Sequence, residues 1–325
     1  MSDDQPILVV VDHVDGALTT PSAEVLTLAR ELTDAPVAAV ALEPPDLPAL
    51  GRYGAGTVHV PDLDGNAPTV SAVAAEGVLA VVAALDPAAV LLVSTFAGKE
   101  LAARLAVGLG SGAVVDATGV RDDDGALVAT KTVLQGTWDT TCRVTAGTPV
   151  IAVKPTVVDA VPVDGVTPEV VEVPVELSGT ARAVRVLGRT AHPRGRAPLP
   201  EARTVVVGGR GVEGDFSLVE ELADVLGAAV GATRVATDEG WIDHAAQVGQ
   251  TGVTIAPRLY IGAGVSGAIH HTAGIQAAQT IVAINSDPDA PILEMADVAV
   301  VGDLNDVLPQ AIEAIRRLRE GDATA

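Results

Sequence analysis

The chain has 325 residues, of which 48% are apolar and only 2% are aromatic, and its formal net charge is −22. This length allows two α/β domains or one large one, with cores built mainly from alanine, valine and leucine. The strong negative charge argues against non-specific nucleic-acid binding, which requires lysine and arginine side chains on the phosphates.

The first part of the sequence alternates between strand and helix signals. Continuous apolar runs predict buried parallel strands at 6–11, 37–42 and 89–94. Apolar residues at helical spacing predict helices at 22–32, 70–85 and 98–109, and Ser22 is the expected N-cap of the first helix. From residue 126 strands are expected to follow one another without helices, at 126–145, 148–158 and 170–177, and to close the first domain.

A linker is predicted at 188–202, because this stretch contains three prolines and two glycines beside arginines. We therefore expect an amino-terminal α/β domain with a β-rich end at 1–187 and a second domain at 203–325. His192 lies within the linker and is expected to be solvated.

The second domain restarts the strand–helix alternation. A strand at 204–207 leads into a glycine-rich turn, and further strands are predicted at 259–261, 280–285 and 298–301 before a closing helix. Ser217 and Glu220 have the spacing of a capping box for a helix at 218–231, with Gly231 as its end. The fold class is therefore α/β, with two domains that each contain a mostly parallel sheet flanked by helices.

Gly262, Gly264 and Gly267 form a GxGxxG pattern after the strand at 259–261. Such a pattern places backbone N–H groups at a strand-to-helix turn, where they can bind a pyrophosphate. The pattern alone fits several readings: a flavin site, a nicotinamide site, or a tight turn without a ligand. Asp287 follows 20 residues after Gly267, as a ribose-binding carboxylate would, so an NAD-dependent Rossmann oxidoreductase is one alternative.

Five segments of the second domain give a more specific indication. They are VVVGGRGVEG (205–214), GAAVGATRVATDEGW (227–241), QVGQTGVTIAPRLYIGAGVSGAIHHTAG (247–274), TIVAINSDPDAPILEMADVAVVGDL (280–304) and DVLPQAI (306–312). In order and spacing they resemble the alpha subunit of electron-transfer flavoproteins. The first domain resembles the family more diffusely, through GKELAARLAVGL (98–109) and the later β-rich stretch.

The resemblance implies a doubly wound FAD-binding domain in the second half of the chain. It also implies a heterodimer with an electron-transfer flavoprotein beta subunit, contacted by the first domain. Such a carrier accepts electrons from flavin dehydrogenases, such as the acyl-CoA dehydrogenases of fatty acid β-oxidation, and passes them toward a quinone oxidoreductase.

The flavin ring becomes anionic on reduction, with charge near N1 and the C2 oxygen, so positive charge and hydrogen-bond donors there stabilise the reduced forms. The resemblance implies that Arg234 is the cation beside the ring, that His271 donates to the C2 oxygen, and that Thr251 lies beside N5 and the C4 oxygen. The other cofactor-binding residues that we expect are Arg210, Thr233, Val248, Gly249, Gln250, Gly264, Ser266, Gly267, Ala268, Ile269, His270, Asn285, Asp303 and Leu304.

The chain departs from the family pattern at three of these segments. His270 stands where the family commonly has glutamine, so a neutral imidazole offers one donor and one acceptor in place of an amide. Ser286 stands where lysine is common, which removes one positive charge, and Thr233 replaces a frequent serine but keeps the hydroxyl.

Several further classes of protein are disfavoured by the sequence. The single cysteine, Cys142, excludes an internal disulfide and a four-cysteine iron–sulfur centre within this chain, and no metal site is expected. No general-base or nucleophile constellation is evident, so we expect an electron carrier without a substrate-transforming site. A non-redox nucleotide-binding or regulatory protein remains a third possibility. The acidic start and the lack of a long apolar run predict a cytoplasmic protein without membrane insertion.

Overall fold

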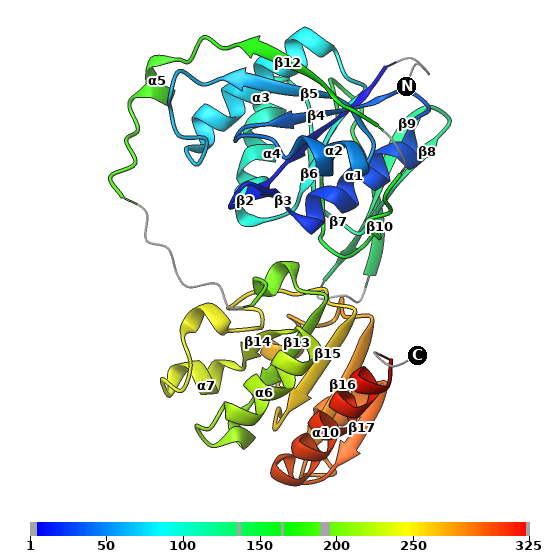
Figure 1. The fold of residues 1–325 in the computed structure, drawn as a ribbon, viewed down its shortest axis with the longest axis vertical. Coiled ribbons are helices and arrows are strands. Elements are labelled where there is room, and N and C mark those ends of the chain that lie inside the picture. Colours follow the sequence, from blue (N-terminus) through cyan, green and yellow to red (C-terminus); the bar gives the residue numbers. More distant parts are fainter. Residues whose placement is uncertain (1–4, 135–137, 164–165, 189–195, 323–325) are drawn as a thin grey trace. The chain divides into compact units, whose positions relative to one another are not determined.

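The computed structural model describes residues 5–134, 138–163, 166–188 and 196–322. The chain forms two compact units, and among the described residues the first consists of 5–133, 138–163 and 166–188 and the second of 134 and 196–322. Both units have an α/β architecture built on a parallel sheet (Figure 1). The predicted fold class is therefore confirmed, whereas the domain boundaries 1–187, 188–202 and 203–325 stay a prediction.

The first unit contains a seven-stranded sheet in the order β12-β5-β4-β1-β6-β11-β7, in which every pairing is parallel. Its central strand β1 pairs Val9 with Ala39 on one side and with Leu91 on the other. The strands are β1 (Ile7–Val11), β4 (Val37–Ala41), β5 (Ala55–Asp62), β6 (Ala89–Val93), β7 (Ala113–Ala117), β11 (Val150–Val153) and β12 (Glu169–Pro174). Continuous apolar strands of this kind are buried on both faces of a parallel sheet.

Helices cover both faces of this sheet. Helix α1 (Thr20–Leu32) packs on one face, and α3 (Ser71–Leu85) and α4 (Phe96–Gly108) pack on the other, so that successive residues of β1 enter separate cores. The short helix α2 (Leu47–Arg52) lies between β4 and β5 in the chain.

The β-rich end of the first unit divides into two parts. Strands β9 (Ala126–Val133) and β10 (Trp138–Arg143) form an antiparallel sheet with β8 (Gly119–Asp123), whereas β11 and β12 join the parallel sheet. A small pair, β2 (His13–Val14) and β3 (Ala17–Leu18), completes the strands described in this unit.

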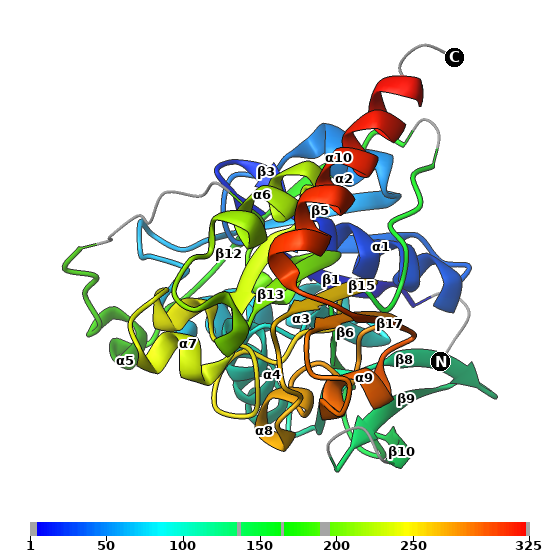
Figure 2. The same cartoon turned by 90° about the horizontal axis from the view of Figure 1, so that it is seen from below.

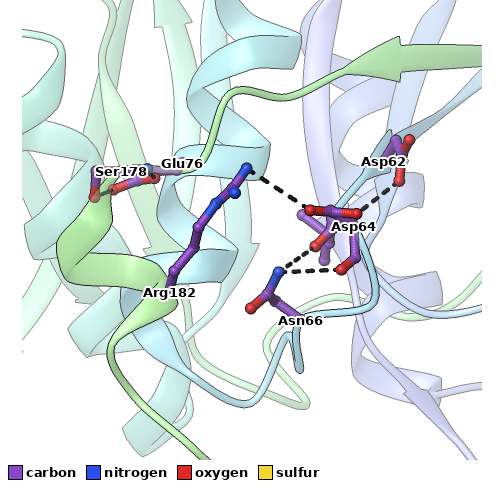
Figure 3. Close-up of polar contacts among 7 residues, drawn as sticks. Asp62, Asp64, Asn66, Glu76, Ser178 and Arg182 are labelled. Carbon is purple, nitrogen blue, oxygen red and sulfur yellow. Dashed lines mark hydrogen bonds and ion pairs between the residues drawn. The ribbon is translucent and has the colours of Figure 1, made fainter.

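Polar contacts hold the segment after β12 against the rest of the first unit (Figure 3). The backbone N–H and the hydroxyl of Ser178 donate to the two carboxylate oxygens of Glu76 in α3, at 2.7 and 2.6 Å. Arg182, at the end of α5 (Gly179–Arg182), lies 3.7 Å from the carboxylate of Asp64. These contacts fix the chain just before it leaves the unit.

The second unit contains a five-stranded parallel sheet in the order β14-β13-β15-β16-β17. The strands are β13 (Thr204–Gly208), β14 (Ala229–Ala232), β15 (Leu259–Ala263), β16 (Thr280–Asn285) and β17 (Val298–Val301). This order is doubly wound, and the chain reverses direction across the sheet between β13 and β15. Ligands of open α/β sheets bind at the carboxyl ends of the strands at such a switch point.

The two faces of the second sheet are covered differently. Helices α6 (Ser217–Leu226) and α10 (Leu304–Asp322) lie side by side over one face (Figure 2). The other face is covered by short or irregular segments that include Val248, Ile255, Ile275 and α9 (Pro291–Met295). The end of the predicted linker belongs to this second core, since Leu199 of a short 3-10 turn is buried in it.

The remaining short elements of the second unit lie before its first strand or in the connections between its strands. They are α7 (Arg234–Asp238), α8 (Ile269–Thr272), and single 3-10 turns at Leu199–Glu201, Arg210–Val212 and His244–Ala246. The sequence did not predict α7 or α9, because both have only five residues. Among the described residues no helix has the length and apolar character needed to cross a membrane.

The predicted N-cap of α1 is wrong. Thr19 is the N-cap, and its hydroxyl oxygen accepts from the Ser22 N–H at 3.3 Å. Ser22 itself is buried within the first turn, where its hydroxyl oxygen accepts from the Asp12 N–H at 2.8 Å. The helix can begin before Ser22 because Pro21, which lacks an N–H, suits the first turn. Similarly, α4 begins at Phe96 and not at residue 98, because Thr95 is its cap.

The predicted capping box and end of the helix after β13 are also wrong. Helix α6 begins at Ser217, and Asp215 accepts hydrogen bonds from both the N–H and the hydroxyl of that residue. These contacts lower the pKa of Asp215. The helix ends at Leu226, with Gly227 in the left-handed region at φ +64°. Gly231 lies instead in β14, where a Cβ would come within 2.9 Å of Val248.

The Thr95 cap gives a stability prediction for the first unit. Thr95 Oγ1 accepts from the Gly98 N–H at 2.9 Å, so Thr95→Ala leaves an N–H of the first turn of α4 without its side-chain partner. We expect the free energy of unfolding to fall by about 1 kcal/mol, and Thr95→Ser to retain most of it. Chemical denaturation followed by circular dichroism measures both variants. Equal losses for alanine and serine would contradict the capping role.

Candidate functional site

A cavity of about 210 Å³ lies at the carboxyl ends of β13, β14 and β15, at the switch point of the second sheet. Its walls come from the turns after these three strands, from the 247–251 segment and from the start of α8. The lining residues are Arg210, Thr233, Arg234, Val235, Gln247, Val248, Gly249, Thr251, Val265, Ser266, Gly267, Ala268, His270 and His271. The structure thus brings together eleven of the seventeen cofactor-binding residues that the sequence predicts.

Glycines set the shape of this cavity by letting backbone segments touch. The Gly211 N–H donates to the Gly264 carbonyl at 3.0 Å, and a Cβ on Gly209 would lie 2.3 Å from that same oxygen. Gly267, at φ +87°, would carry a Cβ 2.3 Å from the backbone nitrogen of Ile292. The glycines are therefore required by contacts within the protein, in addition to any close approach by a ligand.

The turn between β15 and α8 presents free backbone donors to the cavity. Within the described part of the chain, the N–H groups of Ser266, Gly267 and Ala268 donate to no protein oxygen. All three residues line the cavity. Consecutive unpaired N–H groups after a parallel strand are suited to bind an anionic group such as a phosphate.

Arg234 supplies positive charge at the mouth of the cavity. It is the first residue of α7, and its side chain is 65% exposed while its Nε lies 3.1 Å from the Asp238 carboxylate. An exposed ion pair of this kind is weak, so the guanidinium can exchange partners at small cost. Thr233, the residue before it, is the N-cap of α7 but makes no side-chain capping bond.

A buried amide connects two threonines in the cavity wall. Gln247 Oε1 lies 3.0 Å from Thr237 Oγ1, and Gln247 Nε2 lies 2.9 Å from Thr251 Oγ1. Gln247 is only 7% exposed, whereas Thr251 is exposed toward the cavity. The sequence did not single out Gln247 because an isolated glutamine in AAQVGQTG carries no recognisable spacing signal.

His271 is buried, and both of its ring nitrogens have partners within the protein. Nδ1 lies 2.9 Å from the Val248 carbonyl oxygen, which can only accept, so Nδ1 carries a hydrogen. Nε2 lies 2.8 Å from the Tyr260 hydroxyl. Burial lowers the pKa of His271, and the bond to Val248 partly opposes this. Burial also raises the pKa of Tyr260. A neutral ring therefore accepts from the Tyr260 O–H through Nε2.

His270, which replaces the family's usual glutamine, links two turns. Its Nδ1 lies 2.8 Å from Gln250 Oε1, and its carbonyl oxygen accepts from the Gln250 N–H at 2.7 Å. The His270 side chain is exposed and lines the cavity, while Gln250 itself does not line it. His270 thus positions the 249–251 turn against α8.

Six predicted residues do not line the cavity: Gln250, Gly264, Ile269, Asn285, Asp303 and Leu304. Asn285 uses one donor and one acceptor of its amide within the protein, donating to the Val265 carbonyl at 2.7 Å and accepting from the Asp287 N–H at 2.9 Å. Asp303 accepts from the Asn305 N–H and side chain at the start of α10, as a capping residue does. Their proposed contacts with a cofactor stay predictions.

Leu304 and Ile269 differ in their surroundings. Leu304 is buried in the core beneath α6 and α10, whereas the Ile269 side chain is 74% exposed beside the cavity. Two residues that the sequence did not select, Val235 and Val265, supply apolar surface to the lining. Each directly follows a predicted site residue, and this adjacency is the signal that could have identified them.

Comparisons with known proteins identify the family. Residues 198–276 match the electron transfer flavoprotein FAD-binding domain, and residues 7–178 match the electron transfer flavoprotein domain. The chain is 43% identical over 320 residues to the electron transfer flavoprotein subunit alpha of Mycobacterium leprae, covering 95% of this chain and 98% of that protein. It is 43% identical over 317 residues to the protein of the same name from Mycobacterium tuberculosis, with the same coverage.

A more distant relative covers the whole length. The electron transfer flavoprotein subunit alpha of Thermoanaerobacterium thermosaccharolyticum is 36% identical over 335 residues, covering 98% of this chain and all of that protein. The cavity described above lies largely within the matched FAD-binding domain. The chain belongs to the electron transfer flavoprotein family, and its second unit contains that family's FAD-binding domain.

Proposed function

We propose that this chain is the flavin-carrying subunit of a heterodimeric electron carrier, paired with an electron-transfer flavoprotein beta subunit. It accepts electrons from flavin dehydrogenases, such as acyl-CoA dehydrogenases of fatty acid β-oxidation, and passes them toward a quinone oxidoreductase. The observation that carries the proposal is the cavity at the switch point of the second sheet, which combines two arginines, three hydroxyl side chains and three unpaired backbone N–H groups.

The donor set of the cavity fits FAD. The N–H groups of residues 266–268 suit the pyrophosphate, and the apolar surface of Val235 and Val265 suits the ring. When bound, FAD supplies the redox chemistry, because its ring accepts and releases electrons singly or in pairs. The protein supplies binding, orientation and electrostatics. We infer no substrate-transforming site in this chain, since its substrates would be other proteins.

Arg234 and His271 have different electrostatic roles in this proposal. Arg234 is permanently charged and sits at the cavity mouth, where it favours any ligand that gains negative charge. His271 is held neutral by burial, and its Nε2 can donate to a ligand only after it gains a proton and releases the Tyr260 hydroxyl as its donor. Negative charge in the cavity favours that protonation.

The roles of the other predicted residues and of the first domain are proposed on the same family resemblance. Asn285, Asp303 and Leu304 lie at the carboxyl ends of β16 and β17, so they extend the proposed site toward the ribose and adenine of FAD. The first domain is proposed to contact the beta subunit, and the cytoplasmic location stays a prediction. The nicotinamide alternative gains no support, because the comparisons match the chain to electron transfer flavoproteins and their FAD-binding domain.

The cofactor assignment has a direct test. Purified together with its partner subunit, the protein is expected to be yellow and to release FAD on denaturation, because the unpaired N–H groups favour the pyrophosphate. Absorbance spectra and chromatography of the released cofactor measure this. A colourless heterodimer that FAD does not reconstitute, and that binds NADH saturably, would contradict the proposal.

Arg234→Ala is expected to lower the reduction potential of the bound flavin. The loss of one exposed positive charge near the ring corresponds to a shift on the order of 60 mV for one electron, which is one tenfold step in equilibrium. Reductive titration against a dye of known potential measures the shift. Arg234→Lys is expected to retain part of the potential. Arg316→Ala, which removes an exposed arginine from α10, serves as a matched control and is expected to leave it unchanged.

His271 gives a pH prediction. Its pKa in the folded state lies below the ordinary value, so the unfolded chain binds more protons at mildly acidic pH. The stabilising contribution is therefore complete above about pH 6.5 and is lost as the pH falls through the folded-state pKa. We expect the melting temperature of the wild type to fall more steeply below pH 6.5 than that of His271→Gln. His270→Gln is the exposed control, and equal slopes for all three proteins would argue against a buried neutral His271.

A further inference from the structure

Gln247 is a buried polar residue in the cavity wall to which neither the sequence nor the family resemblance gives a role. Its backbone is held on both sides: its N–H donates to the His244 carbonyl at 3.0 Å, and its carbonyl accepts from the Val253 N–H at 2.8 Å. Its side-chain amide lies between two hydroxyls, with Thr237 at one end and Thr251 at the other. Only the Thr251 end reaches the cavity.

The orientation of this amide determines whether the Thr251 hydroxyl donates or accepts a hydrogen bond toward a ligand. With Gln247 Oε1 facing Thr237, the amide N–H donates to Thr251 Oγ1 at 2.9 Å. Thr251 then keeps its own hydroxyl hydrogen for the cavity and acts there as a donor. The orientation is consistent with Thr237, whose hydroxyl hydrogen can reach Gln247 Oε1.

The reversed amide also leaves both ends of the Gln247 side chain with a partner. If Oε1 faced Thr251, it would accept the Thr251 hydrogen and leave Thr251 with only an acceptor for the cavity. The amide N–H would then donate to Thr237 Oγ1. The Thr237 hydrogen would go to the Arg234 carbonyl, which lies 2.9 Å from Thr237 Oγ1. The two networks therefore differ in the polarity of Thr251, and neither leaves a buried polar atom of Gln247 unpaired.

We propose that Gln247 is a positioning residue that sets, and can reverse, the hydrogen-bond polarity of Thr251 toward the bound flavin. This inference rests on the proposed contact of Thr251 with the N5 edge of the ring. A hydroxyl of reversible polarity serves both redox states, since N5 is an acceptor in oxidised flavin and carries N–H in fully reduced flavin. Turning the amide over replaces one set of hydrogen bonds with another, and Gln247 remains buried throughout.

A double-mutant cycle on the FAD-loaded heterodimer tests the proposal. Gln247→Met has nearly the same length and no net charge, and Thr237 keeps the Arg234 carbonyl as its acceptor. We expect Gln247→Met to change the ratio of affinities for oxidised and fully reduced FAD by about tenfold, read as a shift of roughly 30 mV in the two-electron midpoint potential. In a Thr251→Val background the same substitution is expected to change it less than about twofold.

Two further variants keep the result interpretable. An ionised Gln247→Glu side chain offers only acceptors, so it accepts the Thr251 hydrogen and leaves Thr251 as an acceptor toward the cavity. We expect this variant to weaken the binding of oxidised FAD more than the binding of reduced FAD. The Thr251→Val background corrects for the added charge. Gln310→Met removes an exposed glutamine amide from α10 and is expected to leave the potential unchanged. Circular dichroism and the FAD content of each purified variant report whether it folds and binds.

The outcomes separate this inference from the proposed function. An unchanged potential for Thr251→Val in a protein that still holds FAD would remove the Thr251 contact on which the inference rests. A shifted potential for Thr251→Val, together with no shift for Gln247→Met or with equal shifts in both backgrounds, would overturn the role of Gln247 alone. If Gln247→Met does not retain FAD, the cycle is measured with Gln247→Glu, and equal shifts in both backgrounds again overturn the proposal.

Discussion

Backbone contact between two turns is the constraint on which the cavity of the second unit depends. Strands β13 and β15 are adjacent and parallel, so the turns that follow them leave the sheet side by side. The Gly209 N–H donates to the Ala263 carbonyl and the Gly211 N–H donates to the Gly264 carbonyl, each at 3.0 Å. A side chain on Gly209 would fill the space that this contact requires. Residues 266–268, which follow this contact, line the cavity, and among the described residues their N–H groups donate to no protein oxygen.

Buried polar groups behind the lining residues also restrict the conformation of the cavity wall. His271 is bonded to Val248 and Tyr260, and Gln247 is bonded to two threonines. Buried polar groups of this kind are costly unless they are paired, so each pairing restricts the side chain to few orientations. The residues that face the cavity, chiefly Thr251 and Arg234, are exposed, whereas Gln247 and His271 behind them are buried and have partners within the protein. The exposed lining thus lies in front of a layer of paired, buried polar groups.

Much of the fold could be predicted because long periodic segments carry strong signals. The runs at 6–11, 37–42, 89–94 and 280–285 are strands, and the helical spacing at 70–85 marks α3 to within one residue. Predictions from short motifs were wrong where a neighbouring residue makes a different contact. A capping box was expected from Ser217 and Glu220, but Asp215 is close enough to bind both polar groups of Ser217 first. Gly231 resembled a helix end, yet it is the small residue that β14 needs beside Val248.

The sequence by itself determined the class of fold, because apolar periodicity is a property of contiguous residues, and the resemblance of five segments to a known family implied most residues of the cavity. Tertiary structure decided what those residues do. Asp303 became a helix cap, His271 gained two internal partners, and Gln247 acquired a role through atoms of Thr237 and Thr251. The partner of each hydrogen-bonding group depends on which donor and acceptor atoms lie within bonding distance in the folded structure. Those quantities are set only when the strands pair and the turns at their carboxyl ends come together.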